Sequence, residues 1–156
     1  MTFFQRPARH RGGVPACVLV AAVFGGCGGG QRPSDRQLVT QALRSYLHAQ
    51  AAGDGQAACA VLTAVGQKEL IALVMKAGKR LITTRPSCQD AVGLVRAVAG
   101  SNLLSALSSA RIEHVQVSGV SASAEVVDGT GFPPQHVLLE KAGTAWKIAG
   151  VPGLGG

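Results

Sequence analysis

The feature that most constrains this chain is an apolar run near its N-terminus that stops at a cysteine. Val14 to Phe24 is apolar throughout, and the residues before it include Arg6, Arg9 and Arg11 but no acidic residue. The run is shorter than the roughly 20 apolar residues that a membrane-spanning helix needs. A basic stretch followed by a short apolar run is typical of a secretory signal peptide. We therefore expect the chain to be exported and residues 1–26 to be removed.

The run closes with Phe24-Gly25-Gly26-Cys27, which resembles the lipobox of bacterial lipoproteins, with Phe24 where leucine is usual. The resemblance implies that Cys27 receives a diacylglyceryl group and becomes the mature N-terminus. Two acyl chains anchor a protein far more firmly than one, so the protein would stay on the outer face of the cell membrane. The glycine-rich residues 27–33 are then expected to form a flexible tether. The alternatives are an ordinary secretory signal with an incidental cysteine, or an uncleaved helix.

Removal of the leader changes the charge of the part that folds. The whole chain has a formal net charge of +7, but three of its 15 basic residues and none of its 8 acidic residues precede Cys27, which leaves +4. Nucleic-acid binding usually requires a denser basic stripe with stacking aromatics beside it, so we expect no nucleic-acid partner. The cluster of Lys76, Lys79, Arg80 and Arg85 is expected to be a solvated face, or to lean on anionic lipid headgroups.

Export also determines how the cysteines are interpreted. Besides Cys27, the mature chain has Cys59 and Cys88, and in an oxidising compartment we expect them to form a disulfide. Two buried thiols or a redox couple are the alternatives, although the chain has no C-x-x-C spacing. The histidines are scattered and lack the spacing of a zinc site, so we expect no metal.

Downstream of the tether, the pattern predicts helices first and strands afterwards. Capping boxes at Ser34 and Ser87 mark two helix starts, and after Ala110 the apolar period changes from helical to alternating. Helices are expected over 34–52, 56–62, 63–78 and 88–99, and antiparallel strands over 111–118, 120–126, 135–141 and 145–151. Ser118-Gly119 predicts a tight hairpin between the first two strands. Residues 102–109 could be a helical turn or a loop. This order predicts an α+β domain over 34–151 and a disordered tail over 152–156.

Two elements have faces that the spacing defines. The first helix, the longest, has an apolar face at Leu38, Val39, Ala42, Leu43, Tyr46 and Leu47, with Arg36, Gln37, Arg44 and Gln50 on the other side. The second strand alternates, with Val120, Ala122, Ala124 and Val126 on one face. We expect both apolar faces to point into a single core.

The order of elements, the segment Tyr46–Asp54 (YLHAQAAGD) and the segment Trp146-Lys147-Ile148 resemble the nuclear transport factor 2-like superfamily, which includes SnoaL-like and ketosteroid-isomerase-like proteins. The resemblance implies a cone-like domain in which a curved antiparallel sheet wraps the long first helix. It also implies an apolar pocket at the mouth of the cone, for which Tyr46 and Trp146 are the candidates, although such aromatics are more often core residues. The predicted strand count is low for this fold.

A search for catalytic residues yields one carboxylate. An isomerase-like site needs a carboxylate base inside an apolar pocket, and strict alternation places Glu113 on the same face as Val115 and Val117. Glu125 falls on the opposite face and is expected to be solvated. A rim carboxylate or an ion pair with an arginine is the more usual role for Glu113, and no catalytic constellation accompanies it.

These observations predict a non-enzymatic, membrane-tethered lipoprotein of the cell envelope, with no cofactor other than the lipid on Cys27. Its partner would be a small apolar ligand or an envelope protein. The alternatives are an isomerase- or cyclase-like enzyme that uses Glu113, and a structural homodimer that pairs through the sheet. The fold by itself does not choose among them.

Overall fold

A computed structural model of the protein describes residues 32–78, 82, 84–129 and 133–150. The segment Arg32–Gly156 forms one compact unit. The predicted signal peptide, Cys27 as the predicted site of lipid attachment and the predicted tail at 152–156 all lie outside the described residues.

The helices follow the predicted order. They are α1 Asp35–Ala52, α2 Gly55–Val61, α3 Ala64–Ala77, α4 Cys88–Val98 and α5 Ser101–Ser109. Both capping boxes are present: the Ser34 hydroxyl accepts from the Gln37 amide at 3.3 Å, and Ser87 and Asp90 are paired in the same way. Such caps satisfy N–H groups that a helix start leaves unpaired. The segment for which the sequence left a choice between helix and loop forms α5.

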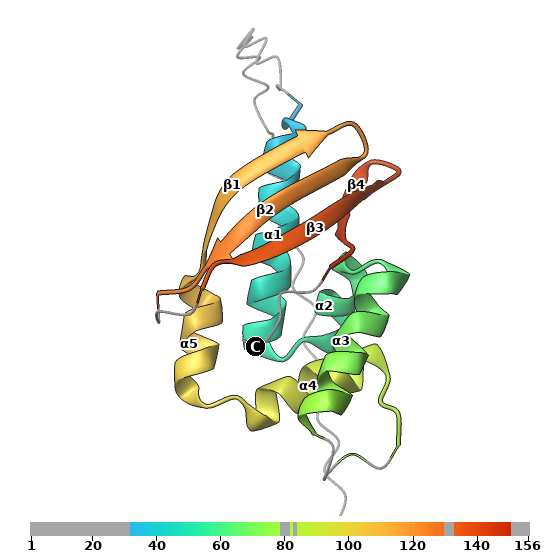
Figure 1. Cartoon of the computed structure of the whole chain (residues 1–156), viewed down its shortest axis with the longest axis vertical. Coiled ribbons are helices and arrows are strands. Elements are labelled where there is room, and N and C mark those ends of the chain that lie inside the picture. The colour runs from blue at the N-terminus through green and yellow to red at the C-terminus, as the bar shows by residue number, and fades with distance from the viewer. Residues whose placement is uncertain (1–31, 79–81, 83, 130–132, 151–156) are drawn as a thin grey trace, which may run out of the picture. The chain divides into compact units, whose positions relative to one another are not determined.

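The strands form one antiparallel sheet. They are β1 Arg111–Ser118, β2 Ser121–Val127, β3 Gln135–Ala142 and β4 Ala145–Ile148, in the order β1-β2-β3-β4. The α+β class, with helices before the sheet and a long first helix packed against it, is therefore confirmed (Figure 1). The predicted hairpin at Ser118-Gly119 is also present, and Gly119 has a φ of +59°, which glycine adopts without strain. Strand β4 is shorter than predicted, because the amides of Ala149 and Gly150 both donate to the Leu138 carbonyl and the chain bends there.

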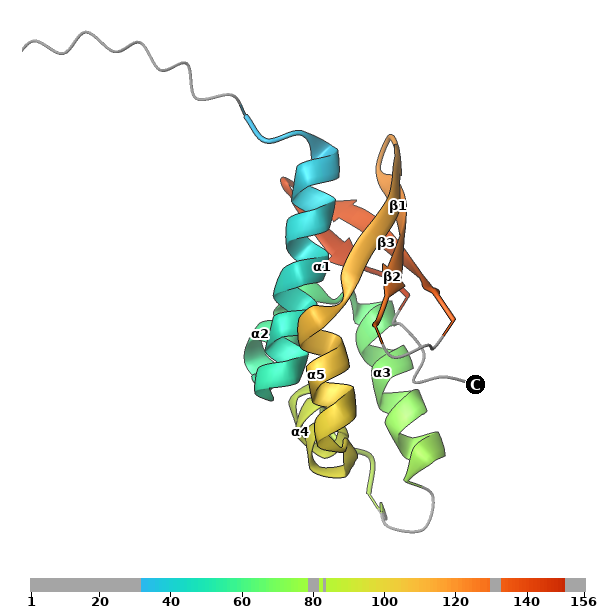
Figure 2. The ribbon, with the colours of Figure 1, turned by 90° about the vertical axis from the view of Figure 1, so that its left-hand side faces the viewer.

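The core lies between α1 and one face of the sheet, here called the inner face (Figure 2). Its sheet residues are buried and alternate along the strands: Ala122, Ala124, Val126, Val137, Leu139, Trp146 and Ile148. The α1 residues Val39 and Leu43 are fully buried against them. Burying a side chain of this size stabilises the fold by about 1.5–3 kcal/mol.

Two residues depart from the predicted faces. Val120 is 69% exposed, because it lies in the turn between β1 and β2 rather than in a strand. Gln50 was expected on the polar side of the first helix but is only 4% exposed. The last turn of α1 is enclosed by α2, α4 and α5, so even its polar residue is covered.

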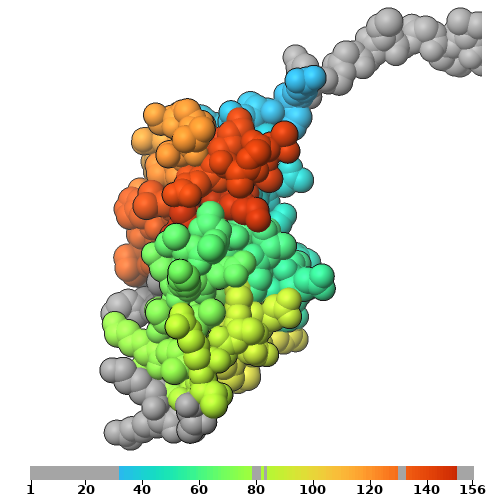
Figure 3. Space-filling model, turned by 90° about the vertical axis from the view of Figure 1, so that its right-hand side faces the viewer, coloured from blue at the N-terminus to red at the C-terminus, as the bar shows by residue number. Residues whose placement is uncertain are grey.

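The outer edge of β4 is covered by the connection between α2 and α3. Leu62 forms a parallel bridge with Ile148, and the Thr63 amide donates to the Ile148 carbonyl at 2.9 Å. The start of α3 then packs directly on this strand, as Figure 3 shows from the side of α3 and β4. A side chain at Gly66 would place its Cβ 2.6 Å from the Ile148 carbonyl oxygen, so this close approach requires glycine.

The predicted disulfide is present. Cys59 in α2 is bonded to Cys88, the first residue of α4, with the Cα atoms 6.1 Å apart. The backbones of these two helices come close, since a Cβ at Gly55 would lie 2.8 Å from the Gln89 carbonyl oxygen. The bond therefore joins two helices that are already in contact.

Within the described part of the chain, no single helix is long and apolar enough to cross a membrane. Helices α4 and α5 reach that length and composition only when taken together, and the chain bends by 117° between them.

Candidate functional site

The face of the sheet that points away from α1 presents mainly polar and charged side chains. We call it the outer sheet face and define it by Arg111, Glu113, Gln116, Ser123, Glu125, His136, Leu138, Glu140 and Lys147. None of the helices α1–α5 lies over it (Figure 1). The strand register arranges most of these residues in rows, one of which is Glu113–Glu125–His136 and the next Gln116–Ser123–Leu138.

A β-bulge in β1 decides which side chains reach this face. Between Glu113 and Gln116 the register shifts, and His114 has a positive φ of 49°. His114 and Val115 together stand opposite Ala124, so the residues before and after the bulge alternate out of step with each other. The predicted shared face of Glu113, Val115 and Val117 was therefore wrong. Val117 and Val115 pack toward the core, whereas Glu113 faces outward.

The two outward carboxylates have different neighbours. Glu113 Oε1 lies 3.2 Å from Arg111 Nε, in an ion pair whose side chains are 41% and 73% exposed. This is the arginine pair that the sequence offered as the alternative to a catalytic base. Glu125 is more enclosed, with 25% of its side chain exposed, and lies 4.0 Å from His114 Nε2 and 3.6 Å from His136 Nδ1.

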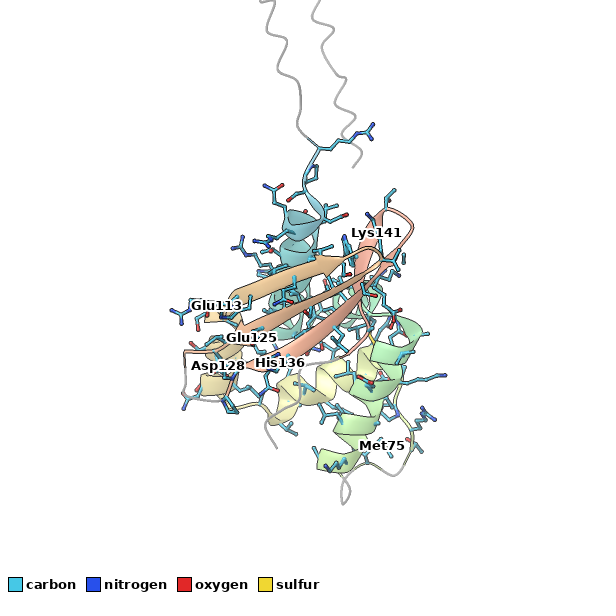
Figure 4. The ribbon with its side chains drawn as sticks, turned by 45° about the horizontal axis from the view of Figure 1, so that its top comes forward. Met75, Glu113, Glu125, Asp128, His136 and Lys141 are labelled. Carbon is cyan, nitrogen blue, oxygen red and sulfur yellow. A yellow bond between two sulfur atoms is a disulfide. The ribbon has the colours of Figure 1, made fainter. Side chains whose placement is uncertain are left out.

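His114 and His136 therefore meet at one carboxylate, from the strands on either side of β2. Figure 4 shows Glu113, Glu125 and His136 on successive strands of the sheet. Among the described residues, no group of three or more His, Cys, Asp or Glu side chains is arranged to hold a metal ion. The arrangement gives the outer sheet face a mixed surface of carboxylate and imidazole groups.

The two predicted pocket residues lie in the core. Tyr46 and Trp146 are each 3% exposed. The Tyr46 hydroxyl accepts a hydrogen bond from Gln50 Nε2 at 2.9 Å, and burial raises the pKa of Tyr46 well above its ordinary value. Gln50 Oε1 is buried and has no hydrogen-bond partner among the described residues. Both aromatic side chains are packed inside the domain rather than at the wall of an open pocket.

A hollow of about 500 Å³ lies elsewhere, on the exposed side of α1. It is lined by Arg36, Gln37, Thr40, Gln41, Arg44 and Ser45. Neither Tyr46 nor Trp146 contributes to it, and the residues that line it are all of polar or basic type.

A cluster that the sequence reasoning missed joins the start of α1 to the β3–β4 hairpin. Lys141 Nζ donates to Asp35 Oδ1 at 2.8 Å and to Oδ2 at 3.0 Å, and Trp146 Nε1 donates to Asp35 Oδ1 at 3.0 Å. The hydrogen bond from Lys141, followed by that from Trp146, holds the pKa of Asp35 below its ordinary value. The sequence contained one indication of this cluster. Lys141 continues the alternation of Val137 and Leu139 on the inner face of β3, where a charged side chain needs a partner.

No protein-family model, curated protein or solved structure matches this chain. The α+β class is established by the structure, and the resemblance to the nuclear transport factor 2-like superfamily stays a prediction.

Proposed function

We propose that this protein is an exported lipoprotein, anchored by a lipid on Cys27, whose α+β domain binds a protein partner in the cell envelope without catalysing a reaction. The observation that carries the proposal is the outer sheet face, which no described helix covers. The anchor would hold the domain close to the membrane, where other envelope proteins are within reach of this face.

The composition of the outer sheet face supports a protein partner. Leu138 is 58% exposed near its centre, in a row with Gln116 and Ser123. Charged residues flank this row on both sides, with Glu125 on one side and Glu140 on the other. An apolar residue within a polar rim is the usual arrangement of a protein–protein interface.

The other partners considered from the sequence have less support. A small apolar ligand would need an open apolar pocket, and the two candidates for its walls, Tyr46 and Trp146, are core residues. An isomerase would need a carboxylate base in such a pocket, whereas Glu113 is on the outer sheet face in an ion pair with Arg111. The first observation favours a protein partner over a small ligand, and the second favours a binding protein over an enzyme.

The lipid anchor is tested by a single substitution. Cys27→Ser should release the protein from the membrane fraction of its host into the soluble envelope fraction or the medium, because the thiol that carries the lipid is lost. Unchanged membrane retention would contradict the anchor and leave the partner-binding proposal to be tested separately.

The partner-binding face is tested by photo-crosslinking in the native host. A photoreactive residue replacing Leu138 should give a discrete adduct with one envelope protein. The matched control carries the same residue at Val98, an exposed apolar position in α4 that is 72% exposed, and should give no such adduct. Equal adducts at both positions, or none at Leu138, would contradict the proposal, and an adduct of twice the chain's mass would identify a homodimer instead.

A further inference from the structure

Helix α1 has a second face that packs against nothing in the described domain. We call it the α1 stripe and define it by the residues that line the hollow: Arg36, Gln37, Thr40, Gln41, Arg44 and Ser45. Their spacing places them in two rows along one side of the helix. Five of the six are exposed and Thr40 is half-buried. The buried residues of α1, such as Val39 and Leu43, face the sheet on the other side.

The α1 stripe is positive. It contains Arg36 and Arg44 and no acidic residue, and the exposed Arg32 lies just before the helix. Asp35, the one acidic residue in α1, bonds to Lys141 and Trp146 instead. No hydrogen bond or ion pair joins the side chain of Arg36 or Arg44 to another residue of the described domain, so both guanidinium groups are available to an external anion.

The predicted tether keeps this stripe close to the membrane. Asp35 follows Cys27 by eight residues, and an extended chain spans at most about 3.5 Å per residue. The first turn of α1 is therefore within about 28 Å of the lipid anchor. Helix α1 has 18 residues and a length of about 27 Å. The whole stripe can reach the surface to which the tether attaches.

We propose that the α1 stripe lies on the anionic phospholipid headgroups of the membrane to which Cys27 is anchored. This inference rests on the lipid anchor of the proposed function, but not on the protein partner. Each arginine near an anionic surface favours contact about fivefold, so Arg36 and Arg44 together favour it about 25-fold. Such a bias is too small to hold a free domain on a membrane, but it orients a domain that a tether already holds there.

The proposed orientation leaves the outer sheet face accessible. Helix α1 packs on the inner face of the sheet (Figure 2), so a membrane against the α1 stripe lies on the opposite side of the domain from the outer sheet face. The other basic cluster is less well placed, because Lys76 is in the last turn of α3. That end of α3 lies at the opposite end of the domain from the start of α1 (Figures 1 and 2).

The test uses the mature chain, Cys27–Gly156, made in an oxidising compartment so that Cys27 is its one free thiol. That thiol is coupled to a maleimide phospholipid in vesicles of phosphatidylcholine, with or without phosphatidylglycerol. A dye is attached through a click-reactive residue replacing either Gln41 in the α1 stripe or Leu138 on the outer sheet face. A quencher on the lipid headgroups then reports which face is near the membrane.

We expect the dye at position 41 to be quenched more strongly than the dye at position 138, and only on vesicles that contain phosphatidylglycerol. Arg36→Gln with Arg44→Gln should remove this preference, which corresponds to a loss of about 25-fold in the ratio of the two orientations. High salt should remove it as well, because it screens exposed charges. The matched control, Lys76→Gln with Arg85→Gln, removes the same charge from two exposed positions outside the stripe. This control should still show stronger quenching at position 41 than at position 138.

The inference would be overturned if the difference in quenching between positions 41 and 138 were the same with and without phosphatidylglycerol. It would also be overturned if the Arg36→Gln/Arg44→Gln variant kept that difference, or if the dye at position 138 were quenched more strongly than the dye at position 41. The anchor is attached chemically, so the result does not depend on whether the host adds a lipid to Cys27. Failure of the Cys27→Ser fractionation test would therefore be distinguishable from failure of this one.

Discussion

Breaking the Cys59–Cys88 disulfide should lower the free energy of unfolding by about 3.5 kcal/mol. The bond closes a loop with a sequence separation of 29 residues. In the chain-entropy model, a cross-link stabilises the folded state by restricting the unfolded chain, and the effect grows slowly with loop length. Because a domain of this size is stable by about 5–15 kcal/mol, the reduced protein should fold but with a much smaller margin.

Urea unfolding of the mature chain measures this change directly. The Cys27→Ser variant prevents intermolecular disulfides, and the protein is compared with and without a reducing agent. Trp146 is the one tryptophan in the chain and is 3% exposed, so its fluorescence reports loss of the core. For an m-value of about 1.75 kcal/mol/M, the midpoint should fall by about 2 M urea on reduction.

A control separates the cross-link from side-chain packing. The double variant Cys59→Ala with Cys88→Ala should resemble the reduced protein to within about 1 kcal/mol, because it removes only two sulfur atoms, one from the buried Cys59 and one from the half-buried Cys88. A decrease of less than about 1 kcal/mol on reduction would refute the reasoning, because restriction of the unfolded chain would then be negligible. A reduced protein with no unfolding transition at all would also refute it, because the bond would then be holding α2 and α4 together in the folded state.

Two further predictions concern contacts described above. Gly66→Ala should lower the free energy of unfolding by about 1–3 kcal/mol, because its Cβ would meet the Ile148 carbonyl oxygen at 2.6 Å. Gly93→Ala in α4, where nothing lies within 4 Å, should instead raise the free energy of unfolding by about 0.5–1 kcal/mol. Thermal unfolding of the two variants measures both changes, and equal effects would contradict the close approach at Gly66. Asp35→Asn should change the pH dependence of stability. Because Lys141 lowers the pKa of Asp35 from its ordinary value of 3.8, the wild type has this stabilisation above that pH and loses it as the pH falls through the lower folded value. Urea midpoints between pH 2 and pH 7 should therefore fall less steeply at the acidic end for the variant, and identical curves would rule out this role for Asp35.

Local features of the fold could be predicted because they depend on residues close together in the chain. The capping box at Ser34 and the hairpin at Gly119 each involve a few consecutive residues with a specific backbone preference. The change from helical to alternating period after Ala110 placed the helices before the sheet. The disulfide was predictable for another reason: once the leader indicates export, Cys59 and Cys88 are an obvious pair.

The features that were missed depend on how the sheet and helices meet. Strict alternation assigned Glu113 to the core side, but the bulge at His114 adds one residue and turns Glu113 outward. The sequence of the eight residues of β1 does not predict that bulge. Gln50 reads as a polar surface residue, yet the helices around the end of α1 bury it.

The candidate site was predictable only in part. The sequence singled out Glu113, but it did not show that His114 and His136 both lie beside Glu125. It also named Tyr46 and Trp146 as pocket residues, while allowing that they belong to the core, where the structure has them. The sequence also indicated a polar side of the first helix that includes Arg36 and Arg44. Only the structure shows that Asp35, the acidic residue nearest to them in the chain, is paired with Lys141.

The sequence by itself determined the α+β class, the order of the elements and the pairing of Cys59 with Cys88. These follow from local backbone preferences, hydrophobic periodicity and the number of cysteines. The tertiary structure alone decided which charges are compensated and which are exposed. Asp35 and Lys141 are 106 residues apart in the chain, and a charge so distant becomes a neighbour only when α1 and the β3–β4 hairpin pack together.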